Sequence, residues 1–262
     1  MSLAAATEPA TAAAMSRGVA LVTGAPRRIG RALALAAAEA GYDLAIHARA
    51  IDGDARALAD TADAMGRRTV LMEADLRDLE APADLVAWAQ DALGPLTLLV
   101  NNASLFEDDR LETLTAETWD AHLDANLRAP IFLAQAFAAQ APEGSLIVNM
   151  LDQRVLKPTP QFFSYALGKA ALWHATQMMA QALAPRVRVN GIGPGPTLPS
   201  IHQSAAEFAA EAANTPLKRR ATPEEIAGAL RYLIDARSVT GQMIAVDGGQ
   251  HLAWRTPDIV SP

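Results

Sequence analysis

Tyr165 and Lys169 form the first pair of side chains whose types and spacing suggest chemistry. They stand four residues apart in SYALGK, so they share one face if this stretch is helical. A phenol has a pKa of about 10 and is a poor acid–base catalyst at neutral pH unless a nearby cation stabilises the phenolate. We expect Lys169 to bias the ionisation of Tyr165. Asp152, which precedes Tyr165 by thirteen residues, adds a carboxylate whose role depends on the substrate.

Composition excludes several classes of function for the 262-residue chain. Apolar residues make up 51%, but no apolar run approaches the roughly 20 residues that cross a bilayer, so we expect a soluble, cytoplasmic protein without a membrane role. A net charge of −7 with only isolated arginine pairs disfavours nucleic acid as a partner. The absence of cysteine excludes disulfides and thiol catalysis, and the five histidines lack HExxH spacing, so no metal site is expected.

Short apolar runs alternate with longer helical patterns from Val19 onward, which is typical of a parallel sheet with helices on both faces. We predict a single doubly wound α/β domain over residues 17–262. Residues 1–16 are small and aperiodic and lack a signal-peptide pattern, so they are predicted to be a disordered tail. The expected strands are 19–23, 43–48, 68–76, 96–104, 145–151, 186–195 and 242–249. The expected helices are 29–41, 56–66, 82–94, the SYALGK region, 223–234, and 115–140 as one helix or two with a bend.

The first expected strand runs directly into TGAPRRIG, where a dinucleotide pyrophosphate would lie on amide N–H groups at the start of the next helix. Gly24 permits the tight turn, and Gly30 lets the helix approach the strand. An ordinary turn between a strand and a helix carries the same pattern. Arg28 stands where such loops usually have glycine, and we expect it to contact cofactor phosphates or an acceptor-rich substrate rather than solvent alone.

The end of the second expected strand bears on the choice of cofactor, because an acidic residue there would bind the adenosine ribose of NAD. The sequence instead has His47 and Arg49, and either can meet the 2′-phosphate of NADP. Arg49 is the better candidate because its charge is fixed. Asp52 nearby and a solvated role for Arg49 leave NAD open, but we expect NADPH.

Five motifs in this order resemble the short-chain dehydrogenase/reductase family: TGAPRRIG, NNAS at 101–104, Asn126 in DANL, YALGK at 165–169 and PGPT at 194–197. The resemblance runs from about Val19 to Leu252. It implies a Rossmann-type fold, NADP-dependent oxidoreductase activity on a small molecule, and a homotetramer.

The resemblance also implies roles for individual residues. Tyr165 would donate the proton, Lys169 would bind the nicotinamide ribose and lower the tyrosine pKa, and Asn126 would help to hold a water relay. Asp75 in ADL would hold the adenine. The implied cofactor contacts are Gly24, Arg28, Ile29, Gly30, His47, Arg49, Asp75, Leu76, Asn102, Ala103, Ser104, Tyr165, Lys169, Pro194, Gly195 and Thr197.

Most members of the family have serine at the position of Asp152, where the hydroxyl donates to a substrate carbonyl. An ionised carboxylate beside a developing alkoxide is repulsive, so Asp152 argues against a simple ketone or secondary alcohol. Aspartate accepts hydrogen bonds from ring N–H and amino groups, and a protonated aspartate can supply a proton to an imine nitrogen. Asp152 therefore favours reduction of a C=N bond.

At Arg28, Phe106 and Asp152 the sequence resembles the pteridine reductases and the bacterial dihydromonapterin and dihydrofolate reductases. That resemblance implies a pterin clamped between nicotinamide and Phe106, with Arg28, Asp152 and Tyr165 as further substrate contacts. Ser104 would contact the pterin or a cofactor phosphate. Phe106 as loop packing, Arg28 as surface charge and Asp152 in another chemistry are the plainer alternatives.

Two other functions stay open from the sequence. One is an NADPH-dependent carbonyl reductase, such as a 3-oxoacyl-thioester reductase. The other is a non-catalytic NADP-binding regulator, which the intact set of Asn126, Tyr165 and Lys169 disfavours. Residues 198–214 are predicted to form either a mobile lid or a fixed surface helix.

Overall fold

Seven apolar segments of the chain form one parallel sheet because helices cover both of its faces and carry the chain from each strand to the next. The computed structural model describes residues 16–200 and 203–253. The strand order is β3-β2-β1-β4-β5-β6-β7, which confirms the predicted doubly wound sheet. The strands are β1 Val19–Val22, β2 Asp43–Ala48, β3 Thr69–Glu73, β4 Leu96–Asn101, β5 Ser145–Met150, β6 Val187–Pro194 and β7 Met243–Val246.

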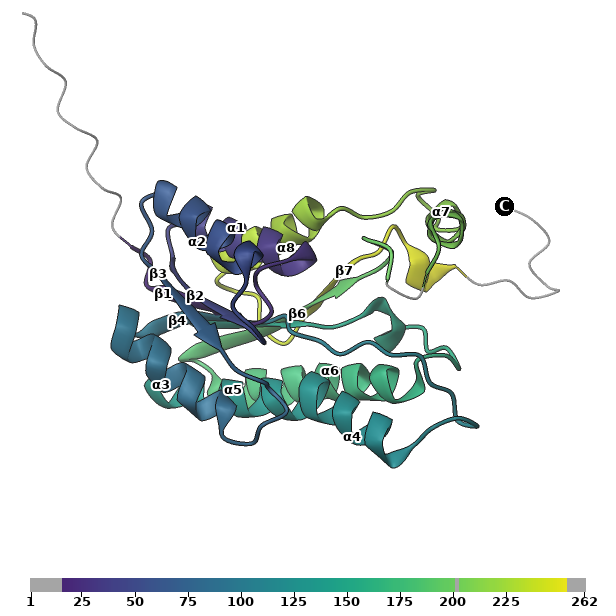
Figure 1. The fold of residues 1–262 in the computed structure, drawn as a ribbon, viewed down its shortest axis with the longest axis horizontal. Helices are drawn as coiled ribbons and strands as arrows, with labels where there is room; N and C mark the ends of the chain where they lie inside the picture. Colours follow the sequence, from purple (N-terminus) through teal and green to yellow (C-terminus); the bar gives the residue numbers. More distant parts are fainter. Residues whose placement is uncertain (1–15, 201–202, 254–262) are drawn as a thin grey trace, which may run out of the picture.

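The helices lie in two layers, with α1, α2 and α8 on one face of the sheet and α3, α4, α5 and α6 on the other (Figure 1). The chain builds outward from β1 through β2 to β3 and then returns to place β4 on the other side of β1. Ligands of such sheets bind at the carboxyl ends of the strands, where the order reverses. The helices are α1 Arg28–Glu39, α2 Gly53–Ala64, α3 Ala81–Leu93, α4 Ala116–Leu123, α5 Ala129–Gln140, α6 Phe163–Leu183, α7 Ala205–Ala213 and α8 Pro223–Asp235.

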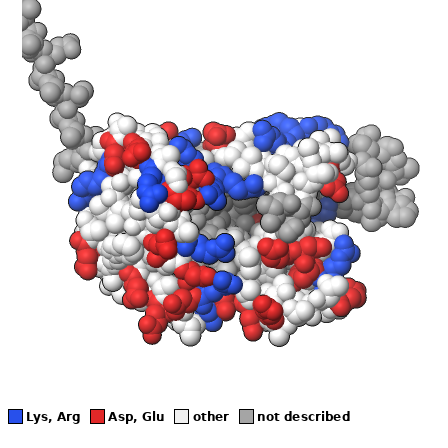
Figure 2. All heavy atoms as spheres, in the orientation of Figure 1, with Lys and Arg blue, Asp and Glu red and all other residues white. Residues whose placement is uncertain are grey.

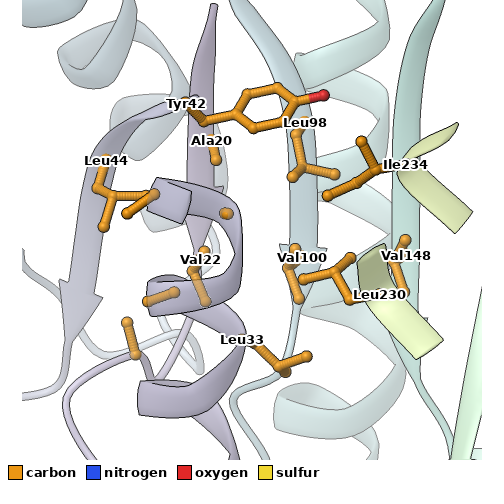
Figure 3. Close-up of a cluster of buried hydrophobic side chains, with 14 of the residues drawn as sticks. Ala20, Val22, Leu33, Tyr42, Leu44, Leu98, Val100, Val148, Leu230 and Ile234 are labelled. Atoms are coloured by element: carbon orange, nitrogen blue, oxygen red, sulfur yellow. The ribbon is translucent and has the colours of Figure 1, made fainter. Parts of the chain in front are cut away.

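The core is divided by the sheet, and the central strand β4 contributes to both halves. Leu98 and Val100 point into the cluster under α1 and α8, which also contains Leu33 and Leu230 (Figure 3). Leu99 points into the opposite cluster, under α3 and α5. This alternation follows from the two-residue period of a strand that is buried on both faces.

The predicted helical region 115–140 is a helix pair joined without a break. Between α4 and α5 lies a π-helical turn, Asp124–Arg128, which contains Asn126. An extra residue in a helical turn shifts the side chains that follow, and such bulges are frequent at functional sites. The apolar period of the sequence predicts the helix but not this turn.

Three predicted segments fall partly outside the described residues. Residues 1–15 of the predicted tail and 254–262 of the predicted domain lie outside them, as do 201–202 of the segment 198–214. In the described part of that segment, α7 begins with a capping box between Ser204 and Glu207. Within the residues that the structure describes, no helix is long and apolar enough to span a bilayer.

Candidate active site

A cavity of about 1130 Å³ opens at the carboxyl ends of the central strands. It is lined by the loops that follow each of the strands β1 to β6 and by Gln250 after β7, so it collects residues from most of the chain. Figure 2 shows this side of the molecule hollowed, with both basic and acidic side chains along the border. The volume falls in the range of cavities that hold cofactors and small molecules, or slightly above it.

The turn from β1 into α1 has no room for a side chain at Gly24 or Gly30, the two glycines for which the sequence predicts a role. Gly24 has φ of +60°, and a Cβ there would lie 3.0 Å from the Cα of Ala103. A Cβ on Gly30 would lie 2.1 Å from the carbonyl oxygen of Gly24. Asn102 reinforces this packing, because its Nδ2 donates to the carbonyls of Thr23 and Gly24 at 2.9 and 3.0 Å. The result is a backbone surface at the start of a helix, which fits a dinucleotide pyrophosphate.

His47 and Arg49 occupy different environments at the end of β2. His47 is buried, its Nδ1 accepts from the backbone N–H of Gly24 at 3.2 Å, and its Nε2 lies 3.1 Å from the carbonyl oxygen of Ala74. Both ring nitrogens therefore have partners within the fold, and burial lowers the imidazole pKa, which keeps the ring neutral. The expected binding of a 2′-phosphate is thus left to Arg49, which is exposed and lines the cavity.

Asp75 and Leu76, expected at the adenine, lie just after β3 on the cavity wall. The Asp75 carboxylate accepts from both Nε and Nη2 of Arg77, the closer contact being 2.6 Å. Hydrogen bonding from Arg77 lowers the pKa of Asp75 to about 2, so this carboxylate is ionised at any physiological pH. Arg77 is a partner that the sequence motif did not predict.

Arg28 adopts a conformation that glycine would adopt without strain. Its φ is +54°, which is uncommon for a residue with a Cβ. Its guanidinium donates to the carbonyl oxygens of Pro199 at 3.0 Å and Leu198 at 3.2 Å. Arg28 therefore joins the glycine loop to the segment after β6, a contact that the prediction of a phosphate or substrate partner did not include.

The turn after β6 brings Pro194, Gly195 and Thr197 to the cavity, as expected from the PGPT motif. Gly195 packs so closely on the end of β7 that a Cβ would lie 2.6 Å from the Cα of Asp247. Thr197 is buried, and its hydroxyl donates to the carbonyl of Gly195 at 3.0 Å. The turn is therefore held rigidly at the mouth of the sheet.

Tyr165 and Asp152 are in direct contact. The tyrosine hydroxyl donates to Asp152 Oδ2 at 2.9 Å, and both residues are buried. Arg154 binds the same carboxylate twice, through its backbone N–H to Oδ1 at 2.8 Å and through Nη1 to Oδ2 at 3.1 Å. The expected acid beside the phenol is thus present, together with an arginine that offsets its charge.

The ionisation of the pair Tyr165 and Lys169 differs from the expectation. Burial and the Asp152 carboxylate raise the pKa of Tyr165 well above its usual value of 10.0, and Arg154 opposes this. The Lys169 ammonium donates to the carbonyl of Met150 at 2.7 Å and lies 5.7 Å from the centre of the tyrosine ring. Burial lowers the pKa of Lys169 to about 8, partly countered by Asp152. Tyr165 is therefore a protonated phenol at neutral pH.

Asn126 is buried on the π-helical turn rather than on a regular helix, and it contacts the loop after β4 that lines the cavity. Its Oδ1 accepts from Ser104 Oγ at 2.8 Å and from the N–H of Leu105 at 3.1 Å, and its Nδ2 donates to the Leu105 carbonyl at 2.9 Å. Ser104 and Asn126 are thus bonded to each other. Asn126 fixes the loop after β4, a role beyond the expected water relay.

Phe106 lies beside the catalytic candidates, but one face of its ring is already covered. It stacks on Phe162 with ring centres 4.2 Å apart and an interplanar angle of 17°. It also meets Tyr165 edge to face at 4.7 Å. The guanidinium of Arg154 lies 5.8 Å from the Phe106 ring and 5.3 Å from the Phe162 ring. The cleft therefore contains an aromatic pair where the sequence predicted one ring.

Three residues of this site were missed by reasoning from the sequence. Phe162 has φ of +54° at the start of α6, and no residue in the stretch PQFFSY indicates this left-handed conformation. Thr23 joins two loops by accepting from the N–H groups of Asn102 and Ala103. Of the three, Arg154 was the easiest to predict from the sequence, because a cation two residues after a candidate carboxylate is a natural partner for it.

Comparisons with known proteins agree with this geometry. The sequence model of the family described as enoyl-(acyl carrier protein) reductase matches residues 24–251. The crystal structure of FolM alternative dihydrofolate reductase 1 from Brucella suis, in complex with NADP, is 45% identical with a TM-score of 0.88. The match covers 92% of this chain and 98% of that one.

Two sequence relatives widen the range of activities. An uncharacterised oxidoreductase of Methylorubrum extorquens is 33% identical over 241 residues, which cover 88% of this chain and 96% of that protein. A 3-oxoacyl-[acyl-carrier-protein] reductase of Staphylococcus aureus is 29% identical over 240 residues, which cover 89% of this chain and 98% of that protein.

Proposed function

Because the chain belongs to the short-chain dehydrogenase/reductase family, we propose that it is an NADPH-dependent reductase that acts on a C=N bond of a dihydropterin. The candidate substrates are a dihydropteridine, dihydromonapterin and dihydrofolate. The observation that carries the proposal is the contact between the buried Asp152 carboxylate and the Tyr165 hydroxyl, next to the aromatic pair Phe106 and Phe162.

Asp152 retains capacity to bind a nitrogen heterocycle. A carboxylate accepts about four hydrogen bonds, and the Asp152 oxygens accept three: one from Tyr165 and two from Arg154. An N–H or amino group of a pterin would fill the remaining position. A ketone oxygen has no proton to offer there, so the same position repels it.

Tyr165 supplies the proton in this proposal. Its raised pKa keeps the phenol protonated, and the hydrogen bond to Asp152 holds the phenol oxygen in place. The hydroxyl hydrogen then turns from Asp152 to the ring nitrogen of the substrate. Transfer of that proton to the ring nitrogen completes reduction of the C=N bond. Lys169, bonded to the Met150 carbonyl, is held in the cavity as a cation below about pH 8.

The cofactor of the proposed reaction is NADPH, which supplies the hydride when bound. The crowded backbone at Gly24 and Gly30 fits its pyrophosphate, and the exposed Arg49 fits its 2′-phosphate. The wall around Asp75 and Leu76 is the proposed adenine site. The NADP complex of the Brucella suis relative supports this assignment.

An assay with purified protein, NADPH and a panel of dihydrobiopterin, dihydromonapterin and dihydrofolate tests the proposal directly. We expect oxidation of NADPH with at least one of them, and no turnover with any would refute it. Asp152→Ser should lower pterin turnover while NADPH binding stays, because serine cannot supply a negative acceptor. Unchanged pterin reduction by this variant would refute the role of the carboxylate.

Carbonyl reduction is the second candidate, and Arg154 is the observation that favours it. The guanidinium lies 3.1 Å from Asp152 Oδ2 and offsets the charge that would repel an oxyanion. The reductase from Staphylococcus aureus, at 29% identity, also supports it. A 3-oxoacyl-thioester panel with NADPH separates the two candidates, since each predicts turnover in only one panel.

A homotetramer is part of the same proposal. α5 and α6 expose Phe132, Leu167 and Met178, and the small residues Ala166 and Ala170 of α6 permit close packing of helices. Exposed apolar side chains on adjacent helices are typical of subunit interfaces. Light scattering of the purified protein gives its mass in solution and tests this directly.

A further inference from the structure

A chain of buried polar side chains lies behind the aromatic pair and takes no part in the proposed reaction. His122 of α4, Ser164 of α6 and Asp109 of the loop after β4 are at most 3% exposed. Ser164 Oγ bonds to Asp109 Oδ2, and His122 Nδ1 lies 2.7 Å from Ser164 Oγ. Buried polar groups are costly unless they are fully hydrogen-bonded, so a connected set of this kind is a specific structural device.

The direction of these hydrogen bonds follows from the partner of His122 Nε2. The backbone N–H of Glu107 donates to His122 Nε2 at 3.1 Å, so Nε2 is an acceptor. The imidazole proton is then on Nδ1 and is donated to Ser164, whose hydroxyl donates to Asp109. Burial lowers the pKa of His122, which agrees with a neutral ring.

The loop that carries Phe106 is held at every second residue. Leu105 is bonded to Asn126, Glu107 to His122, and Asp109 to Ser164. The residues between them, Phe106 and Asp108, line the cavity, as do Leu105 and Glu107. The hydrogen bonds behind the loop therefore set the position of the Phe106 ring in front of it.

The same set of hydrogen-bonded side chains also fixes the start of α6. This helix has no side-chain cap of its own, and its first residues follow Phe162 in a left-handed conformation. The N–H groups of Phe163 and Ser164 donate instead to the carbonyl and carboxylate of Asp109, at 3.2 and 3.1 Å. A carboxylate at a helix N-terminus is stabilising, so Asp109 holds the Phe162 ring against Phe106 from a distance of more than fifty residues in sequence.

We propose that Asp109, Ser164 and His122 are positioning residues that place the Phe106–Phe162 pair for binding of the substrate ring. They leave cofactor binding and proton transfer to other groups. The expected consequence for a dihydropterin rests on the proposed function, whereas the consequence for the loop does not.

Ser164→Ala is the sharpest test, because it removes the hydroxyl that links the other two side chains. With NADPH saturating, it should raise KM for dihydrobiopterin about tenfold or more and change kcat less than about threefold. The dissociation constant for NADPH should not change. A fall in kcat and in NADPH affinity together with the rise in KM would overturn the proposal.

Thr176→Val is the matched control, since it removes another buried hydroxyl of α6. Thr176 Oγ1 accepts from Asn149 Nδ2 at 2.8 Å and donates to the Leu172 carbonyl at 2.7 Å, away from the cavity lining. It should lower stability and leave KM unchanged. Equal changes in KM for Ser164→Ala and Thr176→Val would show that general destabilisation is the cause and would overturn the proposal.

His122 permits replacement of one bond at a time. Gln approximates Nε2 and keeps an acceptor for the Glu107 N–H, whereas Asn approximates Nδ1 and keeps a partner for Ser164. If Asp109, Ser164 and His122 act as one unit, His122→Gln and His122→Asn should both raise KM for dihydrobiopterin. An unchanged KM in both would overturn the role of His122. These variants also serve if Ser164→Ala does not fold.

Amide hydrogen exchange separates this proposal from the proposed function. Ser164→Ala should accelerate exchange in residues 104–110 but not in the glycine loop 24–30. If the wild-type protein reduces no pterin, the proposed function fails while this measurement still decides the positioning role. Unchanged exchange in residues 104–110 would overturn it.

Discussion

The two sides of the cleft are held by different kinds of contact. On the side of the glycine loop, backbone atoms meet so closely that Gly24 and Gly30 cannot carry a Cβ. On the side of Phe106, the positions depend on hydrogen bonds between side chains from separate elements. Sterically fixed backbone tolerates little change, whereas a side-chain network can be altered one bond at a time.

Arg28 links the glycine loop directly to the segment after β6, which lines a third part of the cleft. It starts α1 and donates to the carbonyls of Leu198 and Pro199, which lead toward α7. Its positive φ costs about 1–3 kcal/mol relative to an ordinary conformation, a cost that this contact helps to offset. The comparison between the two sides can be tested by variants that affect only one of them.

Tyr165→Phe should have the largest effect, and only on the substrate side. Loss of the proton donor should lower kcat for pterin reduction by about 10²–10⁴-fold, while NADPH binding is retained. Steady-state kinetics and fluorescence titration with NADPH measure the two quantities. Tyr232→Phe, on the exposed surface of α8, is the control. Turnover within tenfold of the wild type would exclude Tyr165 as the donor.

Arg49→Ala should affect the cofactor side alone. Loss of a charged contact with the 2′-phosphate should weaken NADPH binding about tenfold or more and leave NADH binding unchanged. Titration with each nucleotide measures this, and Arg56→Ala on the exposed face of α2 serves as the control. If both nucleotides weaken equally, the selectivity for NADPH lies elsewhere.

Gly30→Ala tests whether the glycine loop is as crowded as its geometry indicates. The new Cβ would lie 2.1 Å from the Gly24 carbonyl oxygen, so we expect a loss of about 1–3 kcal/mol in the free energy of unfolding. At Gly228 of α8 an added Cβ would meet nothing within 4 Å, and Gly228→Ala should stabilise by about 0.5–1 kcal/mol. Urea denaturation compares the two, and equal effects would contradict the steric account.

The two sides also differ in how far the sequence predicts them. The fold and the glycine loop follow from short-range patterns: the two-residue period of the strands, and glycines six positions apart at Gly24 and Gly30. Tyr165, Lys169 and Asp152 are likewise near one another in the chain. These are features that a single segment specifies on its own.

The missed features depend on contacts between segments that are distant in sequence. His122 and Asp109 lie 42 and 55 residues from Ser164, and no local pattern pairs them. The π-helical turn at Asn126 adds one residue to a turn of a continuous helix, and the period of the apolar residues does not reveal it. The pKa of Tyr165 was predicted in the wrong direction because burial and the Asp152 carboxylate raise it, and the spacing of Tyr165 and Lys169 shows neither.

Asp152→Asn should lower pterin turnover, as Asp152→Ser does, and should also displace the pH profile, which is the smallest of the four effects. The Asp152 carboxylate raises the pKa of both Tyr165 and Lys169, so its removal lowers both. Proton donation needs the protonated phenol, and the cationic lysine exists below its pKa of about 8. Both changes therefore deplete the active form at lower pH than in the wild type.

The alkaline limb of kcat/KM for NADPH reports these groups in the free protein, so it should move toward lower pH in Asp152→Asn. Asp91→Asn, on the exposed face of α3, should leave the limb in place. A limb that moves to higher pH would mean that the carboxylate lowers the pKa of the group that limits activity. That outcome would reverse the electrostatic account of the substrate side while leaving the cofactor side intact, because Asp152 does not touch the glycine loop.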